Sequence, residues 1–393
     1  MRRVYLDHAA TTPVRPEVAQ IMLKYMVEDY GNPSSVHAFG RTTRAVIDDS
    51  REKLAKLIGA DAEGIVFTSG GTEADNLALK GSLEAYPDRG RHIITSQIEH
   101  HAILHTCEYL EKHGYDVTYV GVDSDGKVSV DEVARAMRDD TALVSIMLAN
   151  NEVGTLQPIE EIAKITKAKG VLLHTDSVQA AGQIPIDVKK MGVDMMSISA
   201  HKMYGPKGIG ALYVRRGVRV APVIHGGGHE RGKRAGTENV PGIAAFGKAA
   251  ELAIAEFDQR VEHYLSIRER LIDGILSSVP HSRLNGHRHN RLPNNANIGI
   301  RFVEGESMLL NLDMHGIAMS SGSACTSGSL EPSHVLRAMG ISHEDAHGSL
   351  RMTCGMQTTA EDVDYVLSVL PGIVKRLRDM SPLGLEDRQK ETK

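Results

Sequence analysis

Short apolar runs alternate with longer amphipathic stretches along the chain up to about residue 240. The runs are short and are bounded by Gly, Pro or polar positions, which is typical of buried strands. They occupy residues 64–67, 92–95, 117–120, 142–147, 171–176, 194–199 and 209–214. Stretches with helical spacing lie between the first five of them. Such alternation predicts a mostly parallel sheet with helices on both faces and with ligands at the carboxyl ends of its strands.

After about residue 240 the pattern changes to one long amphipathic stretch, from Phe246 to Ile275, which indicates a bridge to a second domain. Beyond it, short strands such as 297–301 alternate with helices. The chain is therefore predicted to have three parts: a large domain, 15–255; a smaller α+β domain, 1–14 with 256–380; and a polar tail, 381–393, that we expect to be disordered.

The composition excludes several classes of function. Of the 393 residues, 41% are hydrophobic and 24% are charged, and the formal net charge is −5, so we expect no general attraction for nucleic acid or for acidic membranes. Neither a membrane-spanning run nor the apolar core of a signal peptide is evident, which favours the cytoplasm. Cys107, Cys325 and Cys354 are too few and too scattered for a disulfide framework or a metal site, and we expect reduced thiols.

Lys202 and Asp176 stand at the ends of predicted strands and have complementary chemistry. Lys202 lies in the loop between 194–199 and 209–214, where partial burial would lower the pKa of its amine and leave a nucleophile. Asp176 ends the run 171–176. For Lys202 alone, a solvated loop lysine is the commoner explanation. The pair, however, is what pyridoxal phosphate needs: a lysine for the Schiff base and a carboxylate that keeps the pyridine nitrogen protonated.

Polar motifs end three further predicted strands. Residues 68–73 combine small side chains with Thr72, which suits a phosphate. Residues 97–101 offer a histidine for stacking or proton transfer, and residues 150–154 offer amides for a ring oxygen. Each motif alone is equally typical of a turn or of a surface loop. Because the carboxyl ends of parallel strands meet at one edge of a sheet, five polar strand ends in succession predict one crevice.

The combined motifs resemble the fold-type I pyridoxal phosphate enzymes and, within them, the NifS/IscS-type cysteine desulfurases. The match covers nearly the whole chain in the order of the family. Its parts are residues 6–13 (LDHAATTP), 31–35 (GNPSS), 68–74 (TSGGTEA), 99–100 (EH), 150–152 (NNE), 174–179 (HTDSVQ), 199–202 (SAHK), 226–231 (GGGHER), 235–239 (AGTEN) and 320–325 (SSGSAC). The resemblance implies an α/β fold whose large domain has a mostly parallel seven-stranded sheet between layers of helices.

The resemblance also implies how the cofactor ring would be held. Lys202 would form the Schiff base, and Asp176 would hold the pyridine nitrogen. Gln179 and Asn151 would flank the ring and its phenolic oxygen. His100 would stack on the ring face and take part in proton transfer.

Contacts to the cofactor phosphate and to the substrate are implied in the same way. The phosphate would be bound by Gly71, Thr72, Ser199, His201 and, from a second subunit, Thr237. If Thr237 crosses over in this way, the active enzyme is a homodimer. Arg351 and Asn151 would bind the substrate, and Arg351 would hold its carboxylate, a role that suits a planar bidentate donor.

Cys325 determines the type of reaction that we expect. The segment around it, residues 320–329, is rich in Gly, Ser and Thr and predicts an exposed loop, on which a thiolate can attack and then move. By the resemblance, L-cysteine becomes L-alanine and leaves a persulfide on Cys325. The sulfur would then pass to an iron–sulfur scaffold protein of the IscU/NifU type. A transient contact of Cys325 with an iron–sulfur cluster is the only metal contact that this implies.

Other hypotheses remain open at this stage. A selenocysteine lyase or an aminotransferase would use the same cofactor differently, and a non-catalytic member would only bind a partner. Residues 343–347 fit the H-E-x-x-H pattern of zinc proteases, but Ser342 as a helix N-cap and the lack of a third ligand argue against a metal. The sequence identifies neither the sulfur acceptor nor a role for Cys354, and it does not separate a nitrogenase-dedicated enzyme from a housekeeping one.

Overall fold

The computed structural model describes residues 2–321 and 332–380, and within these residues its centre is a seven-stranded sheet. The strands, in the order in which they lie side by side, are β2 (Ile65–Thr68), β8 (Gly210–Val214), β7 (Met195–Ser199), β6 (Leu172–Asp176), β5 (Thr141–Ser145), β3 (His92–Ser96) and β4 (Asp116–Val120). β8 runs antiparallel to its neighbours, and the other pairs are parallel. Each predicted apolar run overlaps one of these strands, and the mostly parallel α/β fold is confirmed.

Helices cover both faces of this sheet because successive strand side chains point to opposite faces. On β6, Leu173 packs into one core and Leu172 into the other; Val144 and Leu143 of β5 divide in the same way. The first face carries α1 (Pro16–Val27), α2 (Ala38–Ile58), α6 (Val130–Ala136), α7 (Ile159–Lys169), α8 (Val188–Met191) and α9 (Val240–Ala255). The second carries α3 (Gly71–Asn76), α4 (Ser82–Ala85) and α5 (His101–Glu111).

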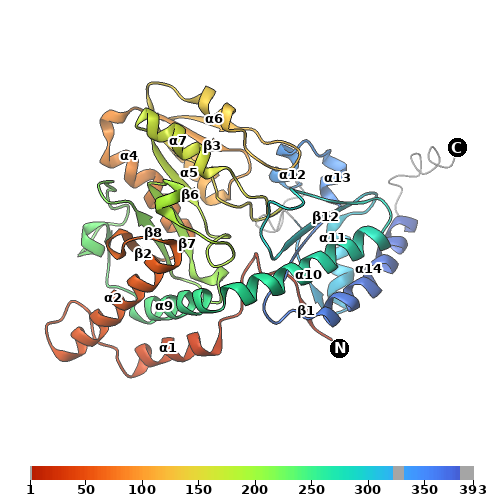
Figure 1. Cartoon of the computed structure of the whole chain (residues 1–393), viewed down its shortest axis with the longest axis horizontal. Helices are drawn as coiled ribbons and strands as arrows, with labels where there is room; N and C mark the ends of the chain where they lie inside the picture. The colour runs from red at the N-terminus through yellow and green to blue at the C-terminus, as the bar shows by residue number, and fades with distance from the viewer. Residues whose placement is uncertain (1, 322–331, 381–393) are drawn as a thin grey trace.

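A second core lies beyond α9, at the right of Figure 1. The amphipathic stretch that leads to it is not one helix but α9 followed by α10 (Phe257–Ser278), which meet at Glu256, where the backbone leaves helical geometry (φ −104°, ψ 10°). The elements of this part are β11 (Ser282–Leu284), β12 (Asn295–Ile300), α11 (Gly305–Met314), β13 (Ile317–Ala318), α12 (His334–Ala338), α13 (His343–His347), β14 (Ser349–Thr353) and α14 (Ala360–Met380).

The start of the chain packs with this second core. β1 (Val4–Tyr5) pairs in parallel with β13, and Val4 and Leu6 are buried among side chains of α10, β12 and α14. β11, β12 and β14 form an antiparallel sheet. The predicted domain boundaries, 15–255 against 1–14 with 256–380, stay a prediction. The predicted tail, 381–393, lies outside the described residues.

Three further observations complete the fold. β9 (Gly228–His229) and β10 (Arg234–Ala235) form a hairpin ahead of α9. No helix in the described part of the chain is long and apolar enough to cross a membrane. At α13, the predicted N-cap is confirmed, because the Ser342 hydroxyl accepts the Asp345 N–H at 3.1 Å. His343 and His347 of the zinc-like pattern contact each other, and residues 2–321 and 332–380 hold no cluster of His, Cys, Asp and Glu fit for a metal ion.

Candidate functional site

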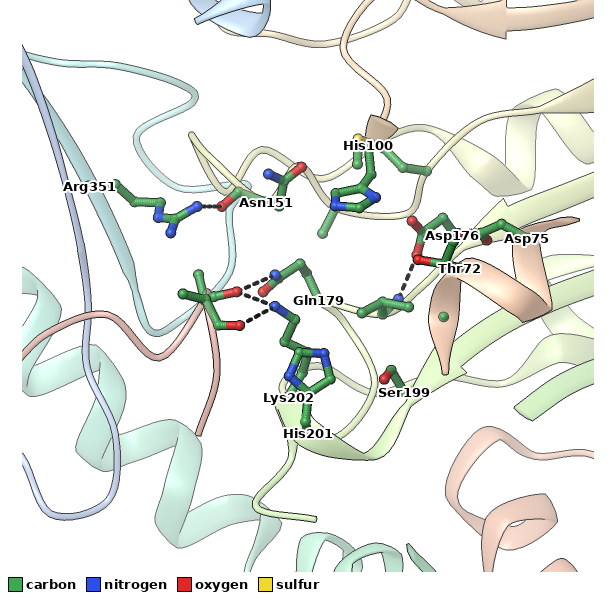
Figure 2. A pocket seen from close by; sticks show the side chains of 16 residues that line it. Thr72, Asp75, His100, Asn151, Asp176, Gln179, Ser199, His201, Lys202 and Arg351 are labelled. Carbon is green, nitrogen blue, oxygen red and sulfur yellow. Dashed lines mark hydrogen bonds between the residues drawn. The ribbon is translucent and has the colours of Figure 1, made fainter. Parts of the chain in front are cut away.

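A cavity of about 350 Å³ opens at the carboxyl ends of β6 and β7. It is lined from the sheet, from α3, and from segments of the second core that include Ala9, Ala10 and Arg351. Figure 2 shows ten of its side chains pointing toward one another. Nine of these and Gly71 are predicted site residues: Gly71, Thr72, His100, Asn151, Asp176, Gln179, Ser199, His201, Lys202 and Arg351. The structure therefore brings most of the predicted site together.

Lys202 enters the cavity from a tight turn, Ala200–Lys202, that directly follows β7. Its Nζ donates hydrogen bonds to the carbonyl oxygens of Ala9 at 2.5 Å and Ala10 at 2.8 Å. The Gln179 amide also donates to the Ala9 oxygen, at 2.9 Å. These backbone oxygens near the start of the chain orient the Lys202 amine (Figure 2). The sequence did not predict this contact, because it joins segments almost 200 positions apart.

Asp176 ends β6 and reaches the cavity as predicted. Its Oδ1 accepts the N–H of Val178 at 2.9 Å, and the side chain is buried. Burial raises the pKa of Asp176, while this N–H and the charge of Lys202 oppose the rise. The Asp176 carboxylate is therefore suited to accept a hydrogen bond from a protonated ring nitrogen bound in the cavity.

The start of α3 supplies small and polar groups to the cavity. A Cβ on Gly71 would lie 2.7 Å from Cγ2 of Val178, so the position accepts no larger residue without movement. Thr72 follows it, the Cβ of Ser199 lies 3.7 Å from the position of the same added Cβ, and the His201 side chain also lines the cavity (Figure 2). Burial and the charge of Lys202 lower the pKa of His201 to about 4. These groups are therefore neutral hydrogen-bonding partners.

His100 caps α5 and is held in one orientation. Its Nδ1 accepts the N–H of Ala102 at 3.1 Å, which leaves the ring proton on Nε2. Burial and the charge of Lys202 lower the pKa of His100 to about 4, so the ring is neutral near pH 7. The ring of His101 lies 6.3 Å from that of His100 and 5.0 Å from that of His334, a cluster that the sequence pattern did not indicate.

Arg351 and Asn151 offer buried polar atoms that nothing in the described structure satisfies. Arg351 lies on β14; its Nη2 donates to Oδ1 of Asp7 at 2.9 Å and its Nη1 to the backbone carbonyl oxygen of Asn151 at 3.4 Å. Its Nε and the Oδ1 of Asn151 are buried and have no partner among the described residues. Since buried polar groups are normally bonded, the pair suits a small ligand that carries both an acceptor and a donor, such as an amino acid.

Some residues of the prediction lie elsewhere. Thr237 does not line this cavity but a separate one of about 240 Å³, with Arg234 and Glu238. Cys325 lies outside the described residues. Cys354 is buried with its Sγ 3.8 Å from the Tyr264 oxygen, and burial raises the pKa of this thiol to about 12, which makes it inert.

Asp75 is a lining residue that sequence reasoning missed. It lies on α3, four positions after Gly71, and its side chain is 2% exposed. Figure 2 places it next to Asp176. The sequence signal that could have indicated Asp75 is its spacing from Gly71. Positions i and i+4 of a helix share a face, so a helix that presents Gly71 to the cavity also presents Asp75.

The chain is similar over nearly its full length to known proteins. The model of the class-V aminotransferase family matches residues 4–366. A cysteine desulfurase IscS from Methanosarcina thermophila is 56% identical over 382 residues, which cover 97% of this chain and 94% of that protein. A solved structure described as a NifS-like protein superposes with a TM-score of 0.90 at 40% identity, over 96% of this chain and 100% of that one. A structure of SspA in complex with cysteine superposes with a TM-score of 0.80 at 37% identity, over 89% and 98%.

Proposed function

The chain belongs to the class-V aminotransferase family, and we propose that it is a pyridoxal phosphate-dependent cysteine desulfurase that supplies sulfur for iron–sulfur clusters. The observation that carries the proposal is the convergence on one cavity of Asp176 from the end of β6, Lys202 from the turn after β7 and Arg351 from the distant β14. Lys202 provides an amine, Asp176 a carboxyl group for a ring nitrogen, and Arg351 a guanidinium group for a substrate carboxylate. The cysteine in the SspA structure belongs to a protein of the same fold.

The lining of the cavity fits pyridoxal phosphate. Asp176 offers a buried carboxylate for the pyridine nitrogen, and Lys202 lies within the same 350 Å³ cavity. The absence of a side chain at Gly71 keeps space beside Val178. Thr72, with the Ser199 and His201 side chains, offers hydrogen-bond donors for a phosphate. When bound, the cofactor supplies an electron sink for the substrate.

The substrate end of the cavity binds and orients an amino acid. The buried Nε of Arg351 donates to the carboxylate of L-cysteine, since its Nη2 is occupied by Asp7. Asn151 accepts from the substrate through its unpartnered Oδ1. His100 is neutral and has its ring proton on Nε2, because its Nδ1 accepts from backbone, so Nε2 donates a hydrogen bond into the cavity that orients the group placed there.

Sulfur transfer is assigned to Cys325 on sequence grounds. Its thiolate attacks the sulfur of L-cysteine, so an S–S bond forms while the C–S bond of the substrate breaks. The electron pair of that bond stays on the substrate carbon, which takes up a proton and becomes the methyl group of L-alanine. Cys325 keeps the sulfur as a persulfide for transfer. The proposed acceptor is an iron–sulfur scaffold protein of the IscU/NifU type, and the proposed compartment is the cytoplasm, in keeping with the unpaired Cys107 and Cys354.

A homodimer is part of the proposal, and an exposed apolar patch supports it. The side chains of this patch are 55–90% exposed: Leu23, Met26, Val27, Tyr30, Val36 and Phe39. Arg44 of α2 pairs with Glu238 at 2.8 Å, which holds the Thr237 segment against the same part of the chain. A second copy on this face would bury the patch and bring Thr237 to the phosphate of its partner. Sedimentation of the protein and of a Val36→Glu variant tests this, and a monomeric parent would exclude it.

The experiment that tests the reaction follows absorbance, sulfide and alanine in one tube. The purified protein with pyridoxal phosphate is expected to show a visible band that changes on addition of L-cysteine, with equal amounts of sulfide and alanine. Lys202→Ala should lose the band, whereas Cys325→Ser should keep it and release no sulfide. Cys354→Ser is the matched thiol control and should retain activity. Keto acid in place of alanine would indicate an aminotransferase, and a protein that stays colourless would exclude the proposal.

A further inference from the structure

The turn that carries Asn151, residues 150–154, is bonded through its backbone carbonyl oxygens to residues 291–297 and to β14. The donors to the carbonyl oxygens of residues 151, 152, 153 and 154 are, in this order, Arg351 Nη1 (3.4 Å), Asn297 Nδ2 (3.1 Å) together with Asn295 Nδ2 (3.2 Å), Arg291 Nη2 (2.7 Å) and the Leu292 N–H (2.9 Å). Figure 2 draws the first of these bonds, between Arg351 and Asn151. A distant part of the chain therefore fixes the backbone of this turn.

The donors on β12 and β14 share one face of their antiparallel sheet. Asn297 of β12 is the register partner of Arg351 on β14, and side chains at partnered positions lie on the same face. The alternate residues of the two strands point to the other face and pack in the second core: Ala296, Ile298, Leu350 and Met352. Asn295 and Asn297 are nevertheless buried. Since buried polar groups are normally bonded, this polar face is built to contact the turn.

Asn297 is bonded at both ends of its side-chain amide. Its Nδ2 donates to the Glu152 carbonyl oxygen, and its Oδ1 accepts from Asn285 Nδ2 at 2.8 Å. Because a backbone carbonyl oxygen only accepts, the NH2 group of Asn297 must face the turn. From within the turn, Asn150 Oδ1 accepts the N–H groups of Glu152 and Val153, both at 2.9 Å. The N–H and the carbonyl group of Glu152 are thus both held by buried asparagine side chains.

We propose that Asn297 is a positioning residue for the substrate: its bond to the Glu152 carbonyl oxygen holds the turn that presents Asn151 to the substrate beside Arg351. Arg351 Nε and Asn151 Oδ1 are buried and have no partner among the described residues. The first atom belongs to β14, and the position of the second depends on the neighbouring strand β12, so one sheet sets both. Groups that are held in place before the substrate binds need little further ordering, which raises affinity.

This inference rests on the proposed function, because the substrate is L-cysteine. It gives a role to a residue that does not itself line the cavity. If Asn297 only stabilised the fold, its loss would lower the free energy of unfolding but would leave KM for L-cysteine unchanged in the folded protein. A positioning role instead predicts a rise in KM, and this rise must depend on the presence of the Asn151 side chain.

The test is a double-mutant cycle in the protein loaded with pyridoxal phosphate. Asn297→Leu removes the donor to the turn at similar size, and Asn151→Ala removes the group that the turn presents. For the parent, both single variants and the double variant, kcat and KM are measured with L-cysteine. The dissociation constant of L-alanine, which has no sulfur to transfer, is read from the absorbance of the bound cofactor. Asp194→Asn is the control, since Asp194 accepts the Leu173 N–H at 2.8 Å beside the amino end of β7, away from the cavity.

The expected effects follow from the loss of one neutral hydrogen bond to the substrate, which weakens binding by about 2- to 12-fold. KM and the dissociation constant of L-alanine should rise about tenfold in Asn151→Ala and about fivefold in Asn297→Leu, where kcat stays within about twofold. The double variant should match Asn151→Ala, because positioning has no effect once the positioned group is gone. Asp194→Asn should keep both constants. Unchanged constants in Asn297→Leu, or a rise of about 50-fold in the double variant, the product of the single effects, overturn the proposal.

Hydrogen exchange in the protein without cofactor gives a measurement that needs no ligand. The N–H groups of Glu152 and Val153 should exchange about tenfold faster in Asn297→Leu, because the turn has lost one of the bonds that hold it. Equal exchange rates in the parent and in the variant overturn the proposal.

A second variant and a second outcome complete the test. If Asn297→Leu does not fold, Asn297→Ser takes its place in every measurement, since its hydroxyl can still accept from Asn285 but is too short to reach the turn. A parent protein that turns over no L-cysteine would refute the proposed function. Exchange at the turn would still report whether Asn297 holds it, so the two failures are distinguishable.

Discussion

Replacing Arg351 by lysine tests the substrate end of the site in the sharpest way. The Arg351 side chain is 3% exposed, its Nη2 donates to Asp7 at 2.9 Å, and its Nε has no partner in the described structure. A lysine ammonium keeps the charge but lacks the planar fork. The nearest anion, Asp7, would hold it, so the carboxylate of L-cysteine loses at least one charge-assisted hydrogen bond.

The size of the loss follows from that one bond. A hydrogen bond to a charged group contributes about 1.5–3 kcal/mol, and every 1.4 kcal/mol is tenfold in affinity. We therefore expect kcat/KM for L-cysteine to fall by roughly 10- to 150-fold in Arg351→Lys, mostly through KM, because the interaction is made in the bound substrate as well as in the transition state.

Steady-state sulfide release over a range of L-cysteine concentrations measures this, and the absorbance of the bound cofactor should stay unchanged. Arg270→Lys is the matched control, since Arg270 pairs with Asp364 at 2.6 Å in an exposed position. Its kinetics should equal those of the parent. If kcat/KM of Arg351→Lys stays within twofold of the parent, or if the loss is confined to kcat, the reasoning that places the substrate carboxylate at Arg351 is wrong.

Three further predictions concern stability, protonation and thiol reactivity. Glu230→Gln should lower the free energy of unfolding in urea by about 3–5 kcal/mol, because it leaves the buried Arg51 without its carboxylate. Asp364→Asn at the surface should lower it by less than about 1 kcal/mol. Equal losses in the two variants would contradict this prediction. In an NMR titration the His100 ring should stay neutral from pH 8 to about pH 5, since its pKa in the folded state is lowered to about 4. The unfolded chain therefore binds a proton at His100 more readily than the folded protein does, so the contribution of His100 makes the free energy of unfolding fall as the pH drops from about 6.5 toward 4. A titration midpoint near 6.5 would refute this prediction. Cys354 should react slowly with alkylating reagents in the native protein, and Cys325→Ser should remove the fast-reacting thiol; rapid labelling of that variant would contradict the assignment.

Much of the fold was predictable because its signals are local. Each buried strand is a short apolar run; Asp176 is the last residue of one run and Lys202 lies three positions after another, so the pattern places both at one edge of a sheet. The same reasoning did not find the break at Glu256, because amphipathic spacing continues across it and only the backbone geometry separates the two helices. Asp75 was missed for a related reason: it lies just after the motif 68–74, for which only a phosphate site was predicted, and nothing local distinguishes a buried acid from an exposed one.

What the sequence by itself determined, then, is the order of strands and helices and the kinds of chemical group at the strand ends, since these depend on neighbouring residues. Only the tertiary structure decided how those groups interact. The carbonyl oxygens of Ala9 and Ala10 reach Lys202 across more than 190 positions, and Asp7 reaches Arg351 across 344. Such contacts set hydrogen bonding, burial and charge, and therefore protonation. They arise from the packing of distant segments, which local patterns do not encode.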